Sequence, residues 1–335
     1  MRDRIGLTRA PEPKLDQIRI VKPRCNPQTR RLGKLRKALT VIVGIEVGGT
    51  FTDLVMVDEQ GGLTVHKIPS TPTDPSIAAV SGMGEILDMS GQGAADVDEL
   101  LHGSTIAANA LIQRRGARTA LITTLGFRDV LFIQRQDKSS VYDMFYQKPA
   151  PLIGRDAVFE INERVDAKGN IIAPMSEDDI VRLVDEIADE FGAESIAVCL
   201  LHAYANPTHE QRIGDIIATR RPNIRVSLSS DVSPEHREYE RTSTTVIDAY
   251  IGPAVDQYLT RYGERVGALG FTGTPLIMQS NGGAVPLQAA RRRIANMFVS
   301  GPAAAVTAAA DIATATNTPN VISVDVGGTS CDVCL

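Results

Sequence analysis

The chain has 335 residues, of which 43% are hydrophobic and 22% charged, with a net charge of −5. This is the composition of an ordinary globular protein, and the length predicts about two domains of roughly 150 residues each. No apolar stretch reaches the ~20 residues that span a bilayer, and the first residues lack the apolar segment of a secretory signal, so we expect no membrane partner. The four cysteines are scattered, which argues against a disulfide framework and predicts a cytoplasmic location.

Charge is unevenly distributed along the chain. Residues 1–37 hold twelve Lys or Arg and three Asp or Glu, whereas the remainder has a net charge of −14. The basic segment has four prolines and no apolar periodicity, so we expect residues 1–40 to be a disordered extension. For this basic segment we favour the interpretation as a non-native leader over a nucleic-acid-binding tail or a transit peptide. The acidic body offers no basic face, so we expect no nucleic-acid partner.

Apolar runs separated by turn residues predict strands and helices in alternation, which is typical of an α/β fold. After a hairpin that starts at Val41, Asp74 and Pro75 give a helix near 74–90 a good N-cap and first turn. A Gly252-Pro253 pair should break the long helix expected at 238–266. The other expected strands are 63–68, 100–105, 118–123, 195–201, 224–229 and 275–279, and the other expected helices are 106–115, 177–191, 207–221 and 302–316.

One short phrase occurs twice. Glu-Val-Gly-Gly-Thr-Phe-Thr-Asp at 46–53 returns at 325–332 as Asp-Val-Gly-Gly-Thr-Ser-Cys-Asp, with five of eight positions identical. Each copy predicts a strand, a Gly-Gly turn and a second strand. Glycines leave backbone N–H groups open to a phosphate, and the neighbouring hydroxyls and carboxylates bind phosphate oxygens or, through water, Mg²⁺. The pair predicts two related half-domains that hold one nucleotide, and two ordinary hairpins are the alternative.

With Gly44 included, the first phrase resembles the opening of the hydantoinase A/5-oxoprolinase family, which includes acetone carboxylase subunits. Five further segments are similar to the same family and stand in the same order. They are 102–111, 119–130, 237–245, 280–283 and 300–304. Together with the second phrase, the likeness runs from about Val41 to Leu335.

The resemblance implies a duplicated α/β fold of the actin-like or sugar-kinase-like ATPase kind (ribonuclease H-like). Residues 41–230 would form the N-terminal domain, and 231–335 the beginning of a second domain whose remainder the chain lacks. Family members use ATP, with Mg²⁺, to open a cyclic amide such as a hydantoin or 5-oxoproline, or to activate a ketone for carboxylation. Phosphorylation of the amide oxygen makes attack by water feasible, and the protein positions the transferring phosphate and stabilises its charge.

Site residues follow from the positions that match. The resemblance implies that the first hairpin binds the cofactor phosphates through Gly48, Gly49, Thr50 and Thr52, and the second through Gly327, Gly328, Thr329 and Ser330. Glu46, Asp53 and Asp325 are the candidate catalytic carboxylates, and Asp325 and Asp332 the candidates to hold Mg²⁺ through water. Each carboxylate has a structural alternative, which is to accept N–H groups of its own turn.

Four weaker candidates for substrate contact are His102, Ser104, Thr105 and Arg135. His102 has an alternative role in capping a turn. Arg135 lies in the irregular stretch at 126–151, which is either a lid or binding loop or a surface loop tethered by ion pairs.

Two residues depart from the family's pattern, because Glu46 stands where the family usually has Asp and Cys331 where it usually has Thr. We expect an ATP-dependent cyclic amidase subunit whose partner is a second, B-type subunit or a C-terminal half. A ketone carboxylase subunit is one alternative. An inactive fragment that needs a partner chain to complete its fold is the other.

Overall fold

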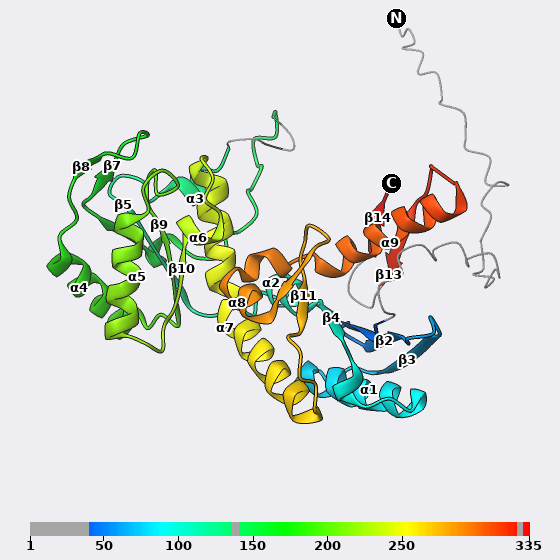
Figure 1. The fold of residues 1–335 in the computed structure, drawn as a ribbon. Coiled ribbons are helices and arrows are strands. Elements are labelled where there is room, and N and C mark those ends of the chain that lie inside the picture. The colour runs from blue at the N-terminus through cyan, green and yellow to red at the C-terminus, as the bar shows by residue number, and fades with distance from the viewer. Residues whose placement is uncertain (1–39, 136–137, 139–140, 327–330) are drawn as a thin grey trace, which may run out of the picture. The chain divides into compact units, whose positions relative to one another are not determined.

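A computed structural model describes residues 40–335 apart from 136–137, 139–140 and 327–330, and Thr40–Leu335 form one compact unit. The expected extension at 1–40 lies, except for Thr40, outside the described residues. Two larger β-sheets with helices against them, together with two small two-stranded sheets, make up the described part of the unit (Figure 1). None of the helices in the described ranges is both long enough and apolar enough to cross a membrane.

The first sheet has six strands in the order β12-β11-β4-β1-β2-β3. Its strands β1, β2 and β3 form an antiparallel meander, and β4 pairs in parallel with the other side of β1. Side chains alternate along β1, so that Val43, Ile45 and Val47 are buried on one face while Glu46 lies on the other. The strands are β1 (Ile42–Val47), β2 (Phe51–Val57), β3 (Leu63–Pro69), β4 (Glu99–Ser104), β11 (Leu276–Met278) and β12 (Ala284–Pro286).

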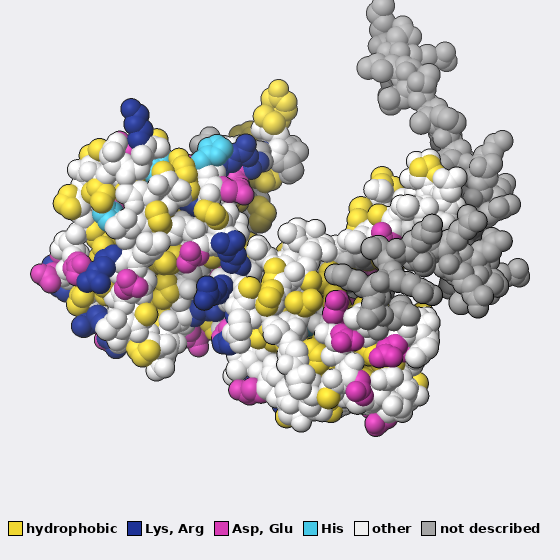
Figure 2. All heavy atoms as spheres, viewed as in Figure 1, with side chains coloured by type: hydrophobic (Ala, Val, Ile, Leu, Met, Phe, Trp, Pro, Cys, Tyr) yellow, Lys and Arg dark blue, Asp and Glu magenta, His cyan; other side chains and the backbone are white. Residues whose placement is uncertain are grey.

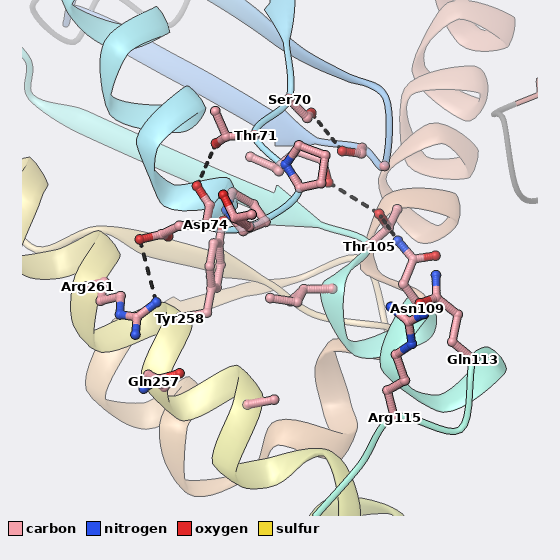
Figure 3. Close-up of a pocket in the computed structure, with 18 residues that line it drawn as sticks. Ser70, Thr71, Asp74, Thr105, Asn109, Gln113, Arg115, Gln257, Tyr258 and Arg261 are labelled. Carbon is pink, nitrogen blue, oxygen red and sulfur yellow. Dashed lines mark hydrogen bonds and ion pairs between the residues drawn. The ribbon is translucent and has the colours of Figure 1, made fainter.

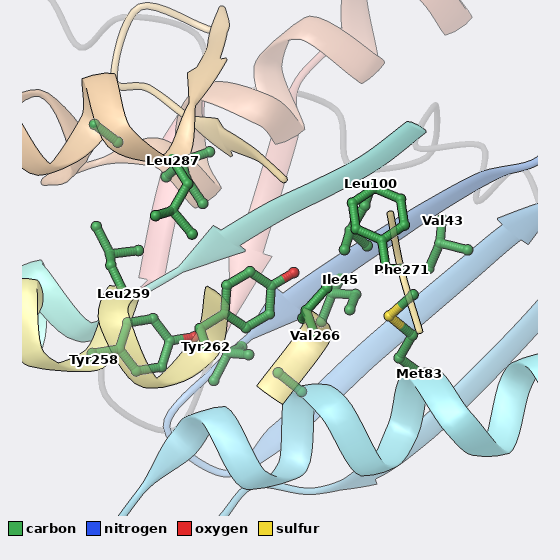
Figure 4. Packing of buried hydrophobic residues seen from close by; sticks show 14 of the residues in the cluster. Val43, Ile45, Met83, Leu100, Tyr258, Leu259, Tyr262, Val266, Phe271 and Leu287 are labelled. Atoms are coloured by element: carbon green, nitrogen blue, oxygen red, sulfur yellow. The ribbon is translucent and has the colours of Figure 1, made fainter. Parts of the chain in front are cut away.

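Helices α1 (Pro75–Ser90) and α7 (Glu238–Leu269) cover the buried face of this sheet. The side chain of Asp74 accepts the N–H of Ser76 and Pro75 opens α1, which confirms the predicted helix start. The main core cluster forms where these helices meet the sheet, and Figure 4 shows Met83 of α1 with Leu259, Tyr262 and Val266 of α7. Helix α9 (Ser300–Thr316) lies against β4 and β11.

The second sheet, β10-β9-β5-β6, is entirely parallel. Its inner strands β5 (Thr119–Thr124) and β9 (Ser195–Cys199) are buried at every position, as expected for a parallel sheet with both faces covered. Helices α4 (Glu177–Glu186) and α5 (Thr208–Arg220) pack on one face, and α3 (Val130–Ile133) and the first half of α7 on the other. The outer strands are β6 (Val158–Ile161) and β10 (Arg225–Leu228).

Ion pairs join the outer surfaces of α4 and α5. Arg212 contacts Glu177 at 2.6 Å and Arg220 contacts Asp185 at 2.6 Å. Figure 2 shows side chains of both charges mixed on this part of the surface. The remaining elements are η3 (Ala94–Asp96), α2 (Ile106–Ile112), η4 (Arg155–Ala157), β7 (Arg164–Val165), β8 (Ile171–Ala173), η5 (Ile187–Phe191), α6 (Ser229–Val232), α8 (Leu287–Arg292), η6 (Ile294–Met297), β13 (Ser323–Val326) and β14 (Cys331–Cys334).

The predicted break at Gly252-Pro253 is wrong, because α7 continues through Pro253 as one helix. Packing against both sheets holds the helix on either side of the proline, with Ala249, Ile251 and Val255 fully buried. Gly252 serves packing instead, since a Cβ there would lie 2.2 Å from Nε of Arg225. Tertiary contacts therefore override the local signal for a helix break.

Substitutions at two glycines of α1 test how tightly this helix packs on the first sheet. A Cβ at Gly82 would lie 2.6 Å from a methyl group of Leu54, whereas one at Gly84 would meet nothing closer than 3.9 Å. We expect Gly82→Ala to lower the free energy of unfolding by about 1–3 kcal/mol through overpacking. Gly84→Ala should raise it by roughly 0.5–1 kcal/mol because alanine favours the helix. Urea unfolding measures both, and equal effects would contradict the packing.

Candidate functional site

The first glycine hairpin is closed by a backbone hydrogen bond. The N–H of Gly48 donates to the carbonyl of Phe51 at 3.0 Å, which leaves Gly49 and Thr50 at the tip. Neither glycine has a positive φ, so the turn does not require glycine for that reason. At Gly48 it requires space, since a Cβ would lie 3.0 Å from the carbonyl oxygen of Phe51. Gly49 and Thr50 are exposed and leave the backbone of the tip open to a ligand.

Ser70, just after β3, holds this turn in place. Its hydroxyl donates to the carbonyl of Gly48 at 2.8 Å, and its N–H donates to the carbonyl of Thr50 at 2.9 Å. The Thr52 hydroxyl lies 3.0 Å from Ser70 Oγ and must be the donor, because the single Ser70 proton is already used. The structure therefore corrects the role expected for Thr52, which is fully buried and supports the turn from behind.

Glu46 and Asp53 face each other across the hairpin, one strand apart. The Glu46 carboxylate fits against two glycines, because a Cβ at Gly103 would lie 1.9 Å from Oε2 and one at Gly301 would lie 3.1 Å from Oε1. Both glycines belong to segments that resemble the family, but the sequence alone did not connect them with Glu46. The longer side chain at position 46 is thus accommodated by missing side chains on β4 and at the start of α9.

Burial and, to a smaller extent, the negative charges of Asp325 and Asp53 together raise the pKa of Glu46 from 4.5 to about 7. Asp325 lies on β13 and is paired with Asp332 across the second hairpin. The three candidate catalytic carboxylates are therefore close enough to interact, although they come from both copies of the repeated phrase. Asp53 also forms an ion pair with Lys67 at 2.6 Å. Residues Gly327, Gly328, Thr329 and Ser330 lie outside the described residues.

A second feature of the turn is a cavity of about 370 Å³. Its walls come from the turn, the segment before α1, helix α2 and the middle of α7, and include Thr105, Asn109, Tyr258 and Arg261 (Figure 3). Of the weaker substrate candidates only Thr105 lines this cavity. Arg135 instead forms an ion pair with Glu240 at the start of α7, which agrees with the tethered-loop interpretation.

His102 is a core residue. It is fully buried, its Nε2 lies 2.7 Å from the Tyr258 hydroxyl, and its ring stacks on Tyr262 with centroids 4.2 Å apart. Burial lowers the pKa of His102 to about 3, so the ring is neutral. In the described part of the chain neither its Nδ1 nor the buried Ser104 hydroxyl has a hydrogen-bond partner. His102 therefore orients Tyr258 at the cavity wall and does not cap a turn.

Mg²⁺ fits the acidic side of the turn. The described residues contain no group of three or more His, Cys, Asp or Glu side chains arranged to hold a metal directly. Mg²⁺ does not need one, since it usually keeps several waters and binds one or two carboxylates together with substrate phosphates. Asp53 and Asp325 beside exposed backbone N–H groups match that donor set, and a cation there would offset the two negative charges that add to the effect of burial on the pKa of Glu46.

Fold and site together define an α/β protein of the actin-like ATPase type. A structure of an ATP-dependent caprolactamase from Pseudomonas jessenii aligns with a TM-score of 0.76 and 35% identity over 87% of this chain. A nucleotide-free acetone carboxylase structure aligns with a TM-score of 0.80 and 28% identity over 88% of it. These likenesses confirm the expected fold class.

The chain belongs to the hydantoinase/oxoprolinase family. The model of the hydantoinase/oxoprolinase N-terminal region matches residues 42–220, and the hydantoinase/oxoprolinase model matches residues 241–335. Caprolactamase subunit alpha of P. jessenii is 35% identical over 88% of this chain, and 5-oxoprolinase 1 of Arabidopsis thaliana is 31% identical over 88%. The chain spans 43% and 26% of the lengths of these two relatives. The division at residue 230 stays a prediction, and β11 and β12 join the same sheet as β1.

Removing the hydroxyl group of Tyr258 or of Tyr262 distinguishes the contribution of the hydrogen bond to His102 from that of ring packing. We expect Tyr258→Phe to lower the free energy of unfolding by about 1–3 kcal/mol, because it leaves the buried Nε2 of His102 without its partner. Tyr262→Phe should change it by less than about 0.5 kcal/mol, since the Tyr262 hydroxyl has no partner among the described residues. Guanidinium unfolding measures both, and equal losses would contradict a specific role for Tyr258.

The raised pKa of Glu46 predicts a pH dependence of stability. The folded state binds the Glu46 proton more tightly than the unfolded state, so its contribution is fully present below about pH 4.5 and is lost as pH rises to about 7. From pH 5 to pH 8 we expect the free energy of unfolding of Glu46→Gln to rise relative to that of wild type by an amount on the order of 2 kcal/mol. The exposed control Glu59→Gln should change the free energy of unfolding by the same amount at pH 5 and at pH 8. If the free energy of unfolding of Glu46→Gln depends on pH as steeply as that of wild type, Glu46 is not the buried carboxylate that titrates near pH 7.

Proposed function

We propose that this chain is the nucleotide-binding part of an ATP-dependent enzyme that opens a cyclic amide by phosphorylating the amide oxygen. The observation that carries the proposal is the convergence of Glu46, Asp53 and Asp325 beside an open glycine turn. Two relatives also support the proposal, namely an ATP-dependent caprolactamase and a 5-oxoprolinase. The chain spans less than half of the length of these relatives, so we propose that the complete activity also needs the region of the relatives that this chain does not match.

In this proposal the hairpin tip binds phosphate oxygens. Backbone N–H groups at Gly49 and Thr50 approach them, and Ser70 keeps the tip rigid from behind. The second hairpin would bind through Gly327, Gly328, Thr329 and Ser330. Asp53, Asp325 and Asp332 would hold Mg²⁺ through water. When bound, ATP would supply the phosphoryl group, and its Mg²⁺ would supply the positive charge that offsets Asp53, Asp325 and Asp332.

Glu46 has the properties of a general base in this arrangement. Its pKa near 7 lets the carboxylate accept a proton from an attacking oxygen at neutral pH and return it later. Gly103 and Gly301 leave the space that this carboxylate occupies. Glu46 would take up this proton at Oε1 or Oε2, and Glu46→Gln would abolish that step.

A ketone carboxylase subunit is the second candidate, favoured by the TM-score of 0.80 to acetone carboxylase. Both chemistries begin with phosphorylation of a carbonyl oxygen, so the turn serves either of them. Some relatives are named as subunits, among them caprolactamase subunit alpha and acetone carboxylase beta subunit. We therefore propose a second, B-type subunit as the partner, and a cytoplasmic location.

Binding of MgATP tests the proposal directly. A Cβ at Gly49 would lie 3.7 Å from Nδ2 of Asn109, so Gly49→Ala fits the fold but narrows the approach to the backbone. We expect MgATP to bind the full chain in calorimetric titration and Gly49→Ala to weaken binding at least ~10-fold, a loss of about 1.4 kcal/mol. Gly84→Ala, away from the turn, is the matched control. A folded wild-type chain that does not bind MgATP would refute nucleotide binding by this chain.

A further inference from the structure

The glycine turn borders two environments of opposite charge. Glu46 and Asp53 lie on the face of the first sheet that meets the start of α9. The cavity lies on the opposite face, where α1 and α7 pack, and Gly48 and Gly49 form part of its wall. A ligand in this cavity would therefore reach the turn from the side opposite to the three carboxylates.

The ionisable side chains of the cavity wall, Tyr258 apart, are Asp74, Arg115 and Arg261. Asp74 contacts Arg261 at 3.6 Å and Arg265 at 2.7 Å, and its hydrogen bonds to Ser76 and Arg265 hold the pKa of its carboxyl below the usual range despite some burial. Its charge is therefore already balanced by arginines. Within the described ranges Arg115 has no carboxylate within ion-pair distance, so the wall carries an excess of positive charge.

Arg115 lies beside two side-chain amides. Figure 3 shows Arg115, Asn109 and Gln113 together on one side of the cavity, while Asp74 and Arg261 lie on the other. The Asn109 amide donates to the Thr105 hydroxyl at 3.1 Å, which fixes its orientation. A planar guanidinium with neighbouring amide donors matches the two oxygens of a carboxylate.

We propose that this cavity binds a cyclic amide that carries a carboxylate, and that Arg115 is the specificity-determining residue that selects it. The carboxylate pairs with Arg115, and the ring extends toward the turn and Tyr258. A volume of about 370 Å³ accommodates a five- or six-membered lactam acid. The inference rests on the proposed function for the identity of the amide, and it separates acidic lactams from neutral ones such as caprolactam.

A matched pair of ligands tests the proposal. Pyroglutamate (5-oxoproline) and 2-pyrrolidinone share one lactam ring and differ in the carboxylate. We expect the full chain with MgATP to bind pyroglutamate at least ~10-fold more tightly than 2-pyrrolidinone in NMR titration. Arg115→Gln should remove this preference by weakening pyroglutamate alone, and Arg115→Lys should restore part of it. Arg182→Gln, an exposed arginine on α4 paired with Asp179, is the control and should keep the preference.

Three outcomes would overturn the inference. They are equal binding of the two lactams by wild type, a preference that survives in Arg115→Gln, and displacement of pyroglutamate by millimolar inorganic phosphate in an Arg115-dependent way, which would make the cavity a phosphate site. Calorimetry with MgATP on the same samples separates this inference from the proposed function. Intact MgATP binding without a carboxylate preference rejects only the role of Arg115, whereas loss of MgATP binding in a folded wild type rejects the proposed function.

Discussion

The packing of α7 against both sheets is the constraint on which the rest of the structure depends. Val246 and Ala249 in its first half are buried against the parallel sheet, and Tyr258, Leu259 and Tyr262 in its second half are buried against the sheet that carries the glycine turn. One continuous helix therefore joins two cores that would otherwise be separate. It also carries Tyr258 and Arg261 to the cavity, so a bend at Pro253 would change the site as well as the fold.

Charge is separated by the same sheet. The carboxylates of Glu46 and Asp53 lie on one face, and the arginines of the cavity lie toward the other. Because side chains alternate along a strand, a single turn at the end of β1 borders both regions. An enzyme that brings a metal-bound nucleotide and an anionic substrate to one turn benefits from this separation, since the metal ion meets the carboxylates and the anionic substrate meets the arginines.

Much of the fold followed from local patterns in the sequence. The helix start at Asp74 and the first hairpin are confirmed, and the strands expected at 118–123 and 195–201 are found at 119–124 and 195–199, because caps, apolar runs and glycine turns act over a few residues. The break at Pro253 was wrong, because burial on both sides of the proline outweighs the missing hydrogen bond. His102 was expected at a substrate or a turn, and the structure places it in the core.

The candidate site was predicted only in part. The repeated phrase identified Glu46, Asp53 and Asp325, whose carboxylates interact in the structure. Ser70 was missed, although it follows the predicted third strand, because nothing local shows that its hydroxyl reaches Gly48. Arg115, for which we propose a role in substrate selection, was not singled out from the sequence, because an arginine at the end of an expected helix is ordinarily a solvated charge.

By itself the sequence determined the α/β class, the family and the two glycine phrases, since each of these is written in residues that lie next to one another along the chain. Only the tertiary structure decided which face of the sheet each side chain occupies and which distant segments meet there. Glu46 lies against Gly103 and Gly301, and Tyr258 pairs with His102, through contacts between residues 57 to 255 positions apart. Such contacts depend on strand register and on the packing of α7 and α9, which no local pattern specifies.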